Sequence, residues 1–319
     1  MMNKKRKVVL VGTGFVGMSM AYSLINRGGV NELVLIDIDK EKTIGEEMDL
    51  SHGLPFAPQK MSIKAGEYVD CKDAKIVVIT AGAAQKPGET RLQLAEKNAR
   101  IVKQITKEVM ASGFNGIIIV ASNPVDLISY VVQKVSGLPK NQVIGSGTIL
   151  DTARLRYLIA ENFNMSSKNI HAYVMGEHGD SSFVPWNYSY IGCKKLLDII
   201  KEKRQSIQKL ENIHKEVVNA AYSIIEKKKA TYYGIGMALS RLVIAILDNE
   251  NSILTISILL EGEYNQDDVY IGVPAVINSN GIREIVKLEL NEEEKRKLDN
   301  SCNIMKDMIK DSIKSIIEE

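Results

Sequence analysis

The chain has 319 residues, of which 45% are hydrophobic and 25% charged, and a formal net charge of +2 at pH 7. This composition is ordinary for a globular protein, and the length allows a sizeable core in one large unit or two closely packed domains. The near-neutral charge, and the lack of a basic patch interleaved with aromatic residues, argue against a nucleic-acid-binding protein.

The N-terminal segment superficially resembles a signal peptide, because the basic residues 4–7 precede an apolar run. That run, residues 8–11, is four residues long, whereas a signal peptide needs about 7–15. No other apolar run approaches the ~18 residues of a membrane span. The three cysteines lack the spacing of a metal site and are typical of reduced thiols in a cytosol. We therefore expect a cytoplasmic protein without a bound metal.

The first predicted strand, residues 8–11, leads into a glycine-rich turn with the sequence Gly-Thr-Gly-Phe-Val-Gly at residues 12–17. A helical pattern follows to about residue 26, and residues 33–36 have the character of a second buried strand. The glycines permit a tight turn and let backbone N–H groups approach a pyrophosphate at the positive end of the helix. These glycines are Gly12, Gly14 and Gly17.

An acidic residue, Asp37, follows the second strand, twenty positions after Gly17. Its carboxylate can accept hydrogen bonds from the ribose hydroxyls of an adenosine and would repel a 2′-phosphate. A glycine triplet alone is weak grounds for a nucleotide site. The complete series of strand, turn, helix, strand and spaced acid predicts a site for NAD rather than NADP.

Strands and helices continue to alternate through the first half of the chain. Helices are expected at residues 41–50 and 91–112, and strands at residues 61–65, 76–80 and 116–121. This alternation predicts an α/β fold of Rossmann type, a doubly wound parallel sheet with its ligands at the carboxyl ends of the strands.

The pattern changes after residue 147. We place a boundary there, between an NAD-binding domain of residues 1–147 and a substrate-binding domain of residues 148–319. In the second half, helices are expected at residues 149–162, 206–228, 233–248 and 291–317, and strands at residues 169–174, 253–260, 269–277 and 282–288. Successive strands without intervening helices favour antiparallel pairing, so this half is expected to be α+β.

Two segments that follow predicted strands of the first half have features of ligand-binding loops. Residues 81–91 contain glycines and a proline, which suits a loop that closes over a ligand. Residues 122–126, Ser-Asn-Pro-Val-Asp, offer an asparagine to a ligand. An Asn-Pro step taken alone is more commonly a simple turn.

His178 lies between two glycines in the segment Met-Gly-Glu-His-Gly-Asp, residues 175–180. The glycines allow a sharp turn and a close approach of a substrate to the imidazole. Histidine titrates near neutral pH, so it can donate a proton in one direction of a reaction and accept it in the other. A lone histidine is more often an ordinary loop residue, and the other motifs of the chain favour a proton-transfer site.

Taken together, these motifs resemble those of the L-lactate dehydrogenases, within the lactate/malate dehydrogenase family. The likeness covers nearly the whole chain. It is carried by residues 12–17, Asp37 and residues 81–91, 122–126, 151–154, 176–180, 230–235 and 269–276. The resemblance implies an enzyme that reversibly reduces pyruvate to (S)-lactate with NADH in fermentative glycolysis.

The resemblance makes His178 the catalytic acid and base, with Asp151 holding its imidazole in one tautomer. Arg91 would polarise the substrate carbonyl, and Arg154 would clamp the carboxylate. Asp151 and Arg154 are three positions apart on a predicted helix and share a face, although such a pair alone is more often a solvated surface ion pair. The implied substrate-binding residues are Gln85, Arg91, Asn123, Asp126, Asp151, Arg154 and Thr231.

The resemblance also implies which residues line the NAD site. They are Gly12, Gly14, Val16, Gly17, Asp37, Lys42, Tyr68, Gly82, Ala83, Ala121, Ser122, Asn123, Ser146 and Ile235. Ile235 would pack on the nicotinamide and leave one ring face open to the substrate.

Gln85 is the residue that separates the substrates within the family. Malate dehydrogenases have an arginine at this position, which pairs with the second carboxylate of oxaloacetate. A neutral glutamine would leave that carboxylate buried without a partner, so Gln85 and the small Thr231 favour pyruvate. The alternatives are a malate dehydrogenase, an enzyme for bulkier L-2-hydroxy acids, and an NAD-binding protein without activity. The last predicts damage to the catalytic residues, and all four residue types are intact.

Two further residues match positions that bind fructose 1,6-bisphosphate in bacterial relatives. Arg156 is two residues past Arg154, about 200° round the helix at ~100° per residue, so it faces away from the substrate. With His171 it would form a cationic site between subunits of a homotetramer, and the bisphosphate would relieve the repulsion between these positive charges. The alternative is that Arg156 pairs with a surface acid and His171 is simply packed. One departure is Lys229, where relatives usually have glycine.

Overall fold

The computed structural model describes residues 6–83, 88 and 90–318, and for Arg91 it describes the main chain only. Within these residues the largest sheet has the strand order β12-β11-β10-β6-β5-β4-β1-β2-β3. Its strands are β1 Lys7–Val11, β2 Glu32–Ile36, β3 Ser62–Ala65, β4 Ile76–Ile79, β5 Ile117–Val120, β6 Val143–Gly145, β10 Ser252–Glu261, β11 Asp267–Asn278 and β12 Gly281–Ile285.

The strands of the first half pair in parallel, as the alternating pattern predicts. β1 pairs with β2 and β4, β2 with β3, β4 with β5, and β5 with β6. β4 and β5 are buried along their whole length. Both faces of such a sheet are covered by helices, which is why these strands are continuous apolar runs rather than alternating ones. The predicted Rossmann-type architecture is confirmed.

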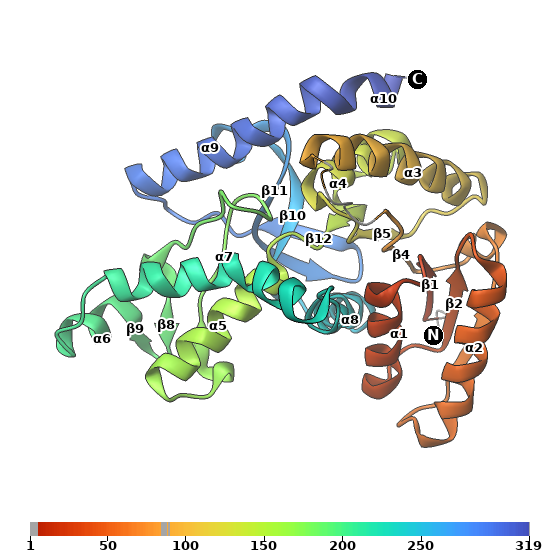
Figure 1. Cartoon of the computed structure of the whole chain (residues 1–319), viewed down its shortest axis with the longest axis horizontal. Helices are drawn as coiled ribbons and strands as arrows, with labels where there is room; N and C mark the ends of the chain where they lie inside the picture. Colours follow the sequence, from red (N-terminus) through yellow and green to blue (C-terminus); the bar gives the residue numbers. More distant parts are fainter. Residues whose placement is uncertain (1–5, 84–87, 89, 319) are drawn as a thin grey trace.

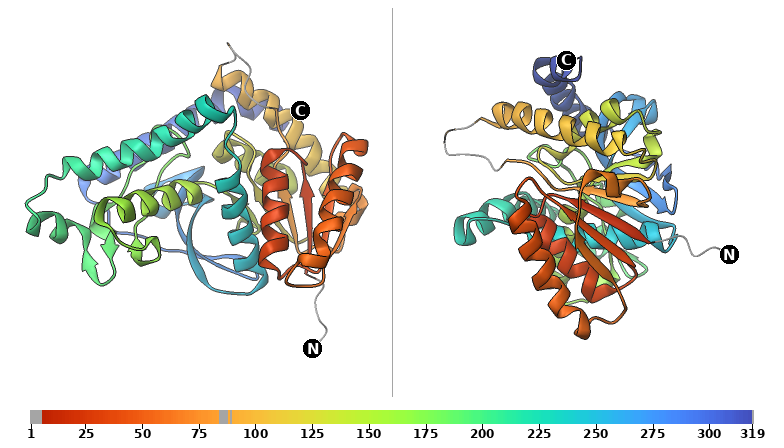
Figure 2. Two further views of the ribbon diagram at one scale, coloured as in Figure 1. Left: turned by 60° about the horizontal axis from the view of Figure 1, so that its bottom comes forward. Right: turned by 90° about the vertical axis from the view of Figure 1, so that its right-hand side faces the viewer.

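The helices of the first half lie on both sides of the sheet, with α1 and α2 on one side and α3 and α4 on the other (Figures 1 and 2). The helices of the chain are α1 Phe15–Arg27, α2 Lys40–Gly53, α3 Arg91–Ala111, α4 Val125–Ser136, α5 Ile149–Phe163, α6 Leu196–Glu202, α7 Gln208–Lys228, α8 Tyr233–Leu247, α9 Glu292–Met308 and α10 Lys314–Glu318.

The large sheet continues from the first half of the chain into the second. β10 pairs antiparallel with β6 through Ser257 and Gly145, and β11 and β12 extend the same edge, also antiparallel. Helix α8 packs on α1, and a Cβ on Gly236 would lie only 2.6 Å from the Ser19 Cβ. The two halves are therefore joined by a shared sheet and by a close helix contact.

A second hydrophobic cluster lies in the second half, where α5 packs against α7 and a small antiparallel sheet. That sheet consists of β7 Ile170–His171, β8 Tyr190–Ile191 and β9 Lys194–Lys195. The strand predicted over residues 169–174 was therefore too long. After His171 the chain leaves the small sheet, and Gly176 instead bridges to Gly272 of β11. This change of partner brings the His178 turn onto the large sheet.

Two other predicted elements also differ from the expectation. The strand predicted over residues 282–288 ends at Ile285, and the Leu288 N–H donates to the hydroxyl of Tyr264 instead of continuing a ladder. The predicted terminal helix is interrupted by a π-helical segment, Ile309–Ile313, between α9 and α10. No helix in the described part of the chain combines the length and apolar character that a membrane span requires.

Candidate active site

The glycine-rich turn connects β1 to α1, and two of its glycines are required by close contacts. Gly12 has a φ of +106°, and a Cβ there would lie 2.5 Å from the Ala81 nitrogen. A Cβ on Gly17 would lie 2.1 Å from the Gly12 carbonyl oxygen. At Gly14 a Cβ would meet nothing within 4 Å, and the N-terminus of α1 has no side-chain cap. Space and free N–H groups are thus present where a pyrophosphate would bind.

Asp37 is tied to this turn by direct hydrogen bonds. The Thr13 N–H donates to its carboxylate at 2.6 Å and the Thr13 hydroxyl at 3.1 Å. Partial burial alone would raise the pKa of Asp37, yet the hydrogen bonds from Thr13 and from the Asp39 N–H lower it below its usual value. The Lys42 ammonium donates to the Thr13 carbonyl at 2.6 Å. An ionised acid at this place suits ribose hydroxyls and disfavours a 2′-phosphate.

The loops after β4 and β5 are joined by a residue that sequence reasoning missed. Asn98, buried in α3, accepts a hydrogen bond from the Ala83 N–H at 2.8 Å and donates to the Asn123 carbonyl at 2.7 Å. The Ser122 hydroxyl donates to the Ala81 carbonyl at 2.5 Å. A polar residue on the apolar face of an otherwise amphipathic helix was the available signal.

Three of the predicted catalytic side chains meet at one place. Asp151 and Arg154, both on α5, form an ion pair of 3.1 Å, and the second Asp151 oxygen lies 2.6 Å from His178 Nδ1. The side chains of Asp151 and Arg154 are 11% and 13% exposed, so this pair is not the solvated surface pair that its spacing alone would suggest. Since Nδ1 is committed to Asp151, Nε2 is the ring nitrogen that can exchange a proton with a substrate.

The electrostatics of this group favour a charged imidazole. The carboxylate of Asp151 raises the pKa of His178 to about 9, against the opposing effect of burial. Burial alone would raise the pKa of Asp151, but the charges of His178 and Arg154 lower it. At neutral pH the pair is therefore an imidazolium beside a carboxylate, ready to give up a proton.

The turn that carries His178 is fixed from both sides. Gly176 exchanges two backbone hydrogen bonds with Gly272 of β11, at 2.9 and 3.0 Å. It has a φ of +98°, in the left-handed region that favours glycine. On the other side, the His178 N–H donates to the Asp126 carboxylate at 2.8 Å. Asp126 as a whole residue is 2% exposed, so its carboxylate is buried in the protein.

The segment that precedes α8 lies beside the glycine-rich turn. Tyr232 stacks on Phe15 with ring centroids 5.1 Å apart, and the Lys228 ammonium lies 3.5 Å from the centre of the Tyr232 ring. Thr231 is the neighbour of Tyr232, so the predicted specificity residue is close in the chain to a contact with the cofactor turn. Gln85 and the side chain of Arg91 lie outside the described residues.

Arg156 and His171 lie away from this group. The Arg156 Nε–H donates to the Ala172 carbonyl at 3.1 Å, and the guanidinium lies 5.4 Å from the centre of the Tyr173 ring. His171 is exposed on β7. Arg156 on α5 and His171 at the end of β7 are therefore close to each other, because Arg156 binds the carbonyl of Ala172, the residue that follows His171.

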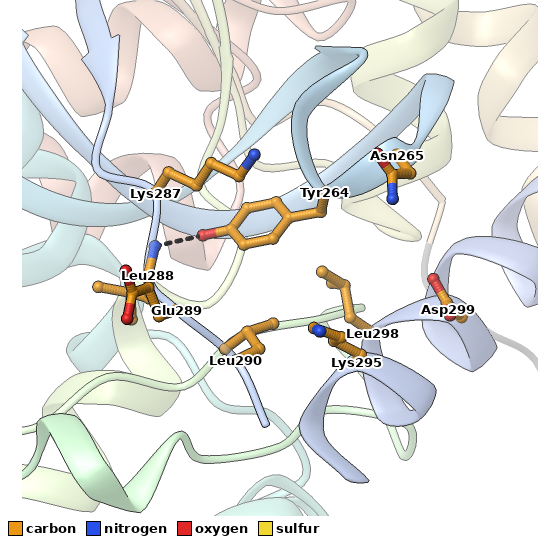
Figure 3. A pocket seen from close by; sticks show the side chains of 9 residues that line it. All are labelled: Tyr264, Asn265, Lys287, Leu288, Glu289, Leu290, Lys295, Leu298 and Asp299. Carbon is orange, nitrogen blue, oxygen red and sulfur yellow. Dashed lines mark hydrogen bonds between the residues drawn. The ribbon is translucent and has the colours of Figure 1, made fainter. Parts of the chain in front are cut away.

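One sizeable cavity has no part in this site. It has a volume of about 570 Å³ and lies between the β10–β11 turn and α9, with Tyr264 and Lys287 on its wall. Figure 3 shows the Tyr264 hydroxyl accepting the hydrogen bond from the Leu288 N–H across this cavity wall, at 2.9 Å. None of the predicted catalytic or cofactor residues lines it.

Two family models and curated relatives match nearly the whole chain. Residues 6–145 match the lactate/malate dehydrogenase NAD binding domain, and residues 148–316 match the lactate/malate dehydrogenase alpha/beta C-terminal domain. L-lactate dehydrogenase 2 of Bacillus cereus (strain ZK / E33L) is 55% identical over 302 residues, covering 94% of this chain and 96% of the relative. L-lactate dehydrogenase of Priestia megaterium is 56% identical over 307 residues, covering 95% of each.

Solved structures show the same likeness. A lactate dehydrogenase from a Medee basin deep-sea metagenome library has a TM-score of 0.94 and 56% identity, with 99% of this chain and 100% of the other covered. The minor L-lactate dehydrogenase from Enterococcus mundtii, in its ligands-bound form, has a TM-score of 0.95 and 47% identity, with 97% and 98% covered.

Proposed function

The chain belongs to the lactate/malate dehydrogenase family, and from this premise we propose that it is an NAD-dependent L-lactate dehydrogenase that reversibly reduces pyruvate to (S)-lactate. The observation that carries the proposal is the group of His178, Asp151 and Arg154, which α5 and the turn at residues 175–180 bring together. This group supplies a proton donor and a cation that binds the substrate carboxylate. Reduction of a 2-oxo acid requires both functions of the protein.

The proposed cofactor site fits NAD on three features of the chain. Gly14 leaves room for a pyrophosphate, the first turn of α1 has N–H groups without a side-chain cap, and Asp37 is ionised at the end of β2. When bound, NADH supplies the hydride that the reduction needs. The remaining cofactor residues given by the family resemblance, from Val16 to Ile235, are proposed to complete the site.

In the proposed reaction Arg154 binds the substrate carboxylate with its planar guanidinium. His178 donates the Nε2 proton to the carbonyl oxygen as the carbonyl carbon is reduced, and Asp151 stabilises the imidazolium before transfer. In lactate oxidation the neutral imidazole takes the hydroxyl proton back. Arg91 is proposed to stabilise the charge that develops on the carbonyl oxygen, an effect worth about 10²–10³ in rate for one good donor.

Substrate choice is proposed to rest on Gln85 and Thr231, whereas Asn123 is proposed to contact the substrate without deciding between acids. A glutamine at position 85 offers no charge to a second carboxylate, so closing the site over oxaloacetate would leave that group unpaired. The test is the decrease in NADH absorbance with pyruvate, oxaloacetate and 2-oxoisocaproate at equal concentrations. Pyruvate should give the largest kcat/KM. A larger value for oxaloacetate would establish a malate dehydrogenase, and one for 2-oxoisocaproate an enzyme for bulkier acids.

We also propose a cytoplasmic homotetramer activated by fructose 1,6-bisphosphate, with Arg156 and His171 as phosphate ligands. The anion site is supported by the exposed His171, which lies next in the chain to Ala172, the residue that accepts a hydrogen bond from Arg156. The subunit contacts are supported by large apolar side chains that are exposed on α1 and α8. Phe15, Tyr22, Tyr233 and Met237 are each more than 60% exposed.

The test of the effector site measures the pyruvate KM and the mass by light scattering, with and without the bisphosphate. The bisphosphate should lower KM in the wild type and have no effect on R156Q. K168Q changes an exposed lysine nearby and should respond like the wild type. An unchanged KM and mass in the wild type would refute the effector site.

A further inference from the structure

Asp126 is a second carboxylate beneath the catalytic turn, and both of its oxygens are already used by protein groups. One oxygen accepts from the His178 N–H at 2.8 Å, and the other accepts from the Ser257 hydroxyl at 2.5 Å. Asp126 and Ser257 are buried, with 2% and 0% of the residue surface exposed. The family resemblance implies a substrate-binding role for Asp126. In the structure, however, its buried carboxylate is engaged by His178 and Ser257, so a substrate contact alone does not account for its placement.

The place of Asp126 in the fold connects three elements that are distant in sequence. It lies in the first turn of α4, which follows β5 and Asn123, and Ser257 lies on β10. A Cβ on Gly145 of β6 would lie 2.7 Å from the Ser257 Cβ. Close packing therefore holds the Ser257 hydroxyl in place. Asp126 binds this hydroxyl and the main-chain N–H of His178, so it connects the His178 turn to β10.

Burial disfavours the ionised form of Asp126, because the charge is removed from water. Burial raises the pKa of Asp126 to about 6, although the hydrogen bonds from Ser257 and from the His178 N–H oppose the rise. Asp126 is therefore mostly ionised at neutral pH, and its charge acts on the imidazole as well as on the main chain. A neutral asparagine could accept the same N–H and donate to the serine, so hydrogen bonding alone does not require an acid.

We propose that Asp126 is a positioning residue for the proton transfer, which fixes the main chain of His178 and places a second negative charge beneath its imidazole. The inference rests on the proposed function, in which His178 is the proton donor. Asp151 then sets the ring orientation from one side, and Asp126 sets the position and charge of the turn from the other.

Other charged groups also lie around the imidazole, and they remain in place when Asp126 is changed. Asp151 and Arg154 on α5 act on the imidazole, Glu177 on the turn acts on Asp126, and Asp151 also acts on His214 of α7. Glu177 accepts from Ser181 at 2.5 Å, and Asp180 lies 3.4 Å from the Tyr222 hydroxyl.

The deciding experiment is an NMR titration of imidazole-labelled histidines in the full-length protein, in the wild type and in D126N. The chain has four histidines, so the signal of His178 can be assigned by its loss in H178N. D126N preserves the hydrogen-bond geometry and removes the charge. We expect the titration of His178 to move about one pH unit lower, a tenfold change in its protonation equilibrium. D198N, which changes an exposed acid on α6, should leave it unchanged.

The kinetic counterpart is the pH dependence of kcat/KM for pyruvate. In D126N the loss of activity at high pH should begin about one unit lower, while the NADH affinity is unchanged. S257A keeps the charge but removes a donor to Asp126, so the high-pH limb should stay in place while any activity loss near pH 6 moves to higher pH.

A His178 titration in folded D126N that coincides with the wild type would overturn the inference. If D126N does not fold, the pH profile of S257A takes over, and an unshifted acid limb there would overturn it instead. The NMR titration needs no substrate, so it remains decisive even if pyruvate is not turned over. Absence of pyruvate reduction with a shifted titration would refute the proposed function alone.

Discussion

The two ends of the active site are built in different ways. The cofactor end is a contiguous turn of six residues and one acid; close packing at its glycines and the hydrogen bonds from Thr13 to Asp37 hold it together. The proton-transfer end is assembled from α4, α5, β10 and an isolated turn, and its hydrogen bonds join residues far apart in sequence. A local motif can therefore be recognised from the spacing of its residues in the sequence. A site assembled from distant segments is recognised only when each segment matches a motif of a known family.

The largest effect should come from removing the proton donor. We expect H178N to lower kcat for pyruvate by about 10²–10⁴, the usual contribution of general acid–base catalysis. NADH binding, measured by fluorescence titration, should be unchanged, because the cofactor end is separate. H52N changes an exposed histidine on α2 and should retain full activity. Equal losses of NADH affinity and kcat would show that the two ends are not independent.

The specificity position should give the next largest effect. In Q85R an arginine can pair with the second carboxylate of oxaloacetate, so the ratio of kcat/KM for oxaloacetate to that for pyruvate should rise by about 10². Steady-state rates with both acids measure it. Q104R, which places an arginine at an exposed position further along α3, is the matched control. An unchanged ratio in Q85R would remove Gln85 from the substrate site.

Proton transfer should give the reaction a pH dependence of opposite sign in its two directions. The pKa of His178 is raised to about 9, so the imidazole is protonated at neutral pH and loses its proton as the pH rises through that value. Pyruvate reduction should fall about tenfold per unit above pH 9, and lactate oxidation should rise towards pH 9. Measuring kcat/KM in both directions on one buffer series tests this. Parallel profiles would exclude His178 as the shared group.

A pair of matched substitutions can separate the role of the cofactor turn in NADH binding from its role in stability. In G14A the added methyl meets nothing in the protein, so the melting temperature should be unchanged while NADH binding weakens, because the methyl occupies the space proposed for the pyrophosphate. In G17A the methyl would lie 2.1 Å from the Gly12 carbonyl, so the protein itself should lose stability by about 1–3 kcal/mol. Calorimetry and NADH titration separate the two. A stable G17A with normal binding would contradict the packing argument.

Much of the cofactor end could be predicted from sequence because its chemistry is local. The turn, the alternating strands and the ionised Asp37 follow from glycine spacing and apolar runs. The proton-transfer end could be predicted only through family resemblance, since no spacing rule brings His178 to Asp151. Asn98 and Ser257 were missed because each is one of several polar residues in its element, and its partners lie on other elements.

The smallest effect concerns the one noted departure from the family, and the structure explains it. Lys229 ends α7 with a φ of 71°, in the left-handed region, and its N–H donates to the Ile225 carbonyl at 2.7 Å. Glycine adopts this conformation without strain, whereas a side chain there costs about 1 kcal/mol. K229G should therefore stabilise the protein by up to ~1 kcal/mol, seen as a melting temperature higher by about 2 °C.

The control for K229G lies two residues earlier on the same helix. Lys227 is in the last turn of α7 and has the helical conformation, so K227G removes the same side chain but should destabilise the protein by about 0.5–1 kcal/mol. Opposite signs for the two variants would show that backbone conformation, not charge, decides the effect. If both variants lowered the melting temperature, the lysine side chain would have a stabilising contact that outweighs the strain. In that case its neighbour Lys228, stacked on Tyr232, would be the place to look, because it links this helix end to the cofactor turn through Phe15.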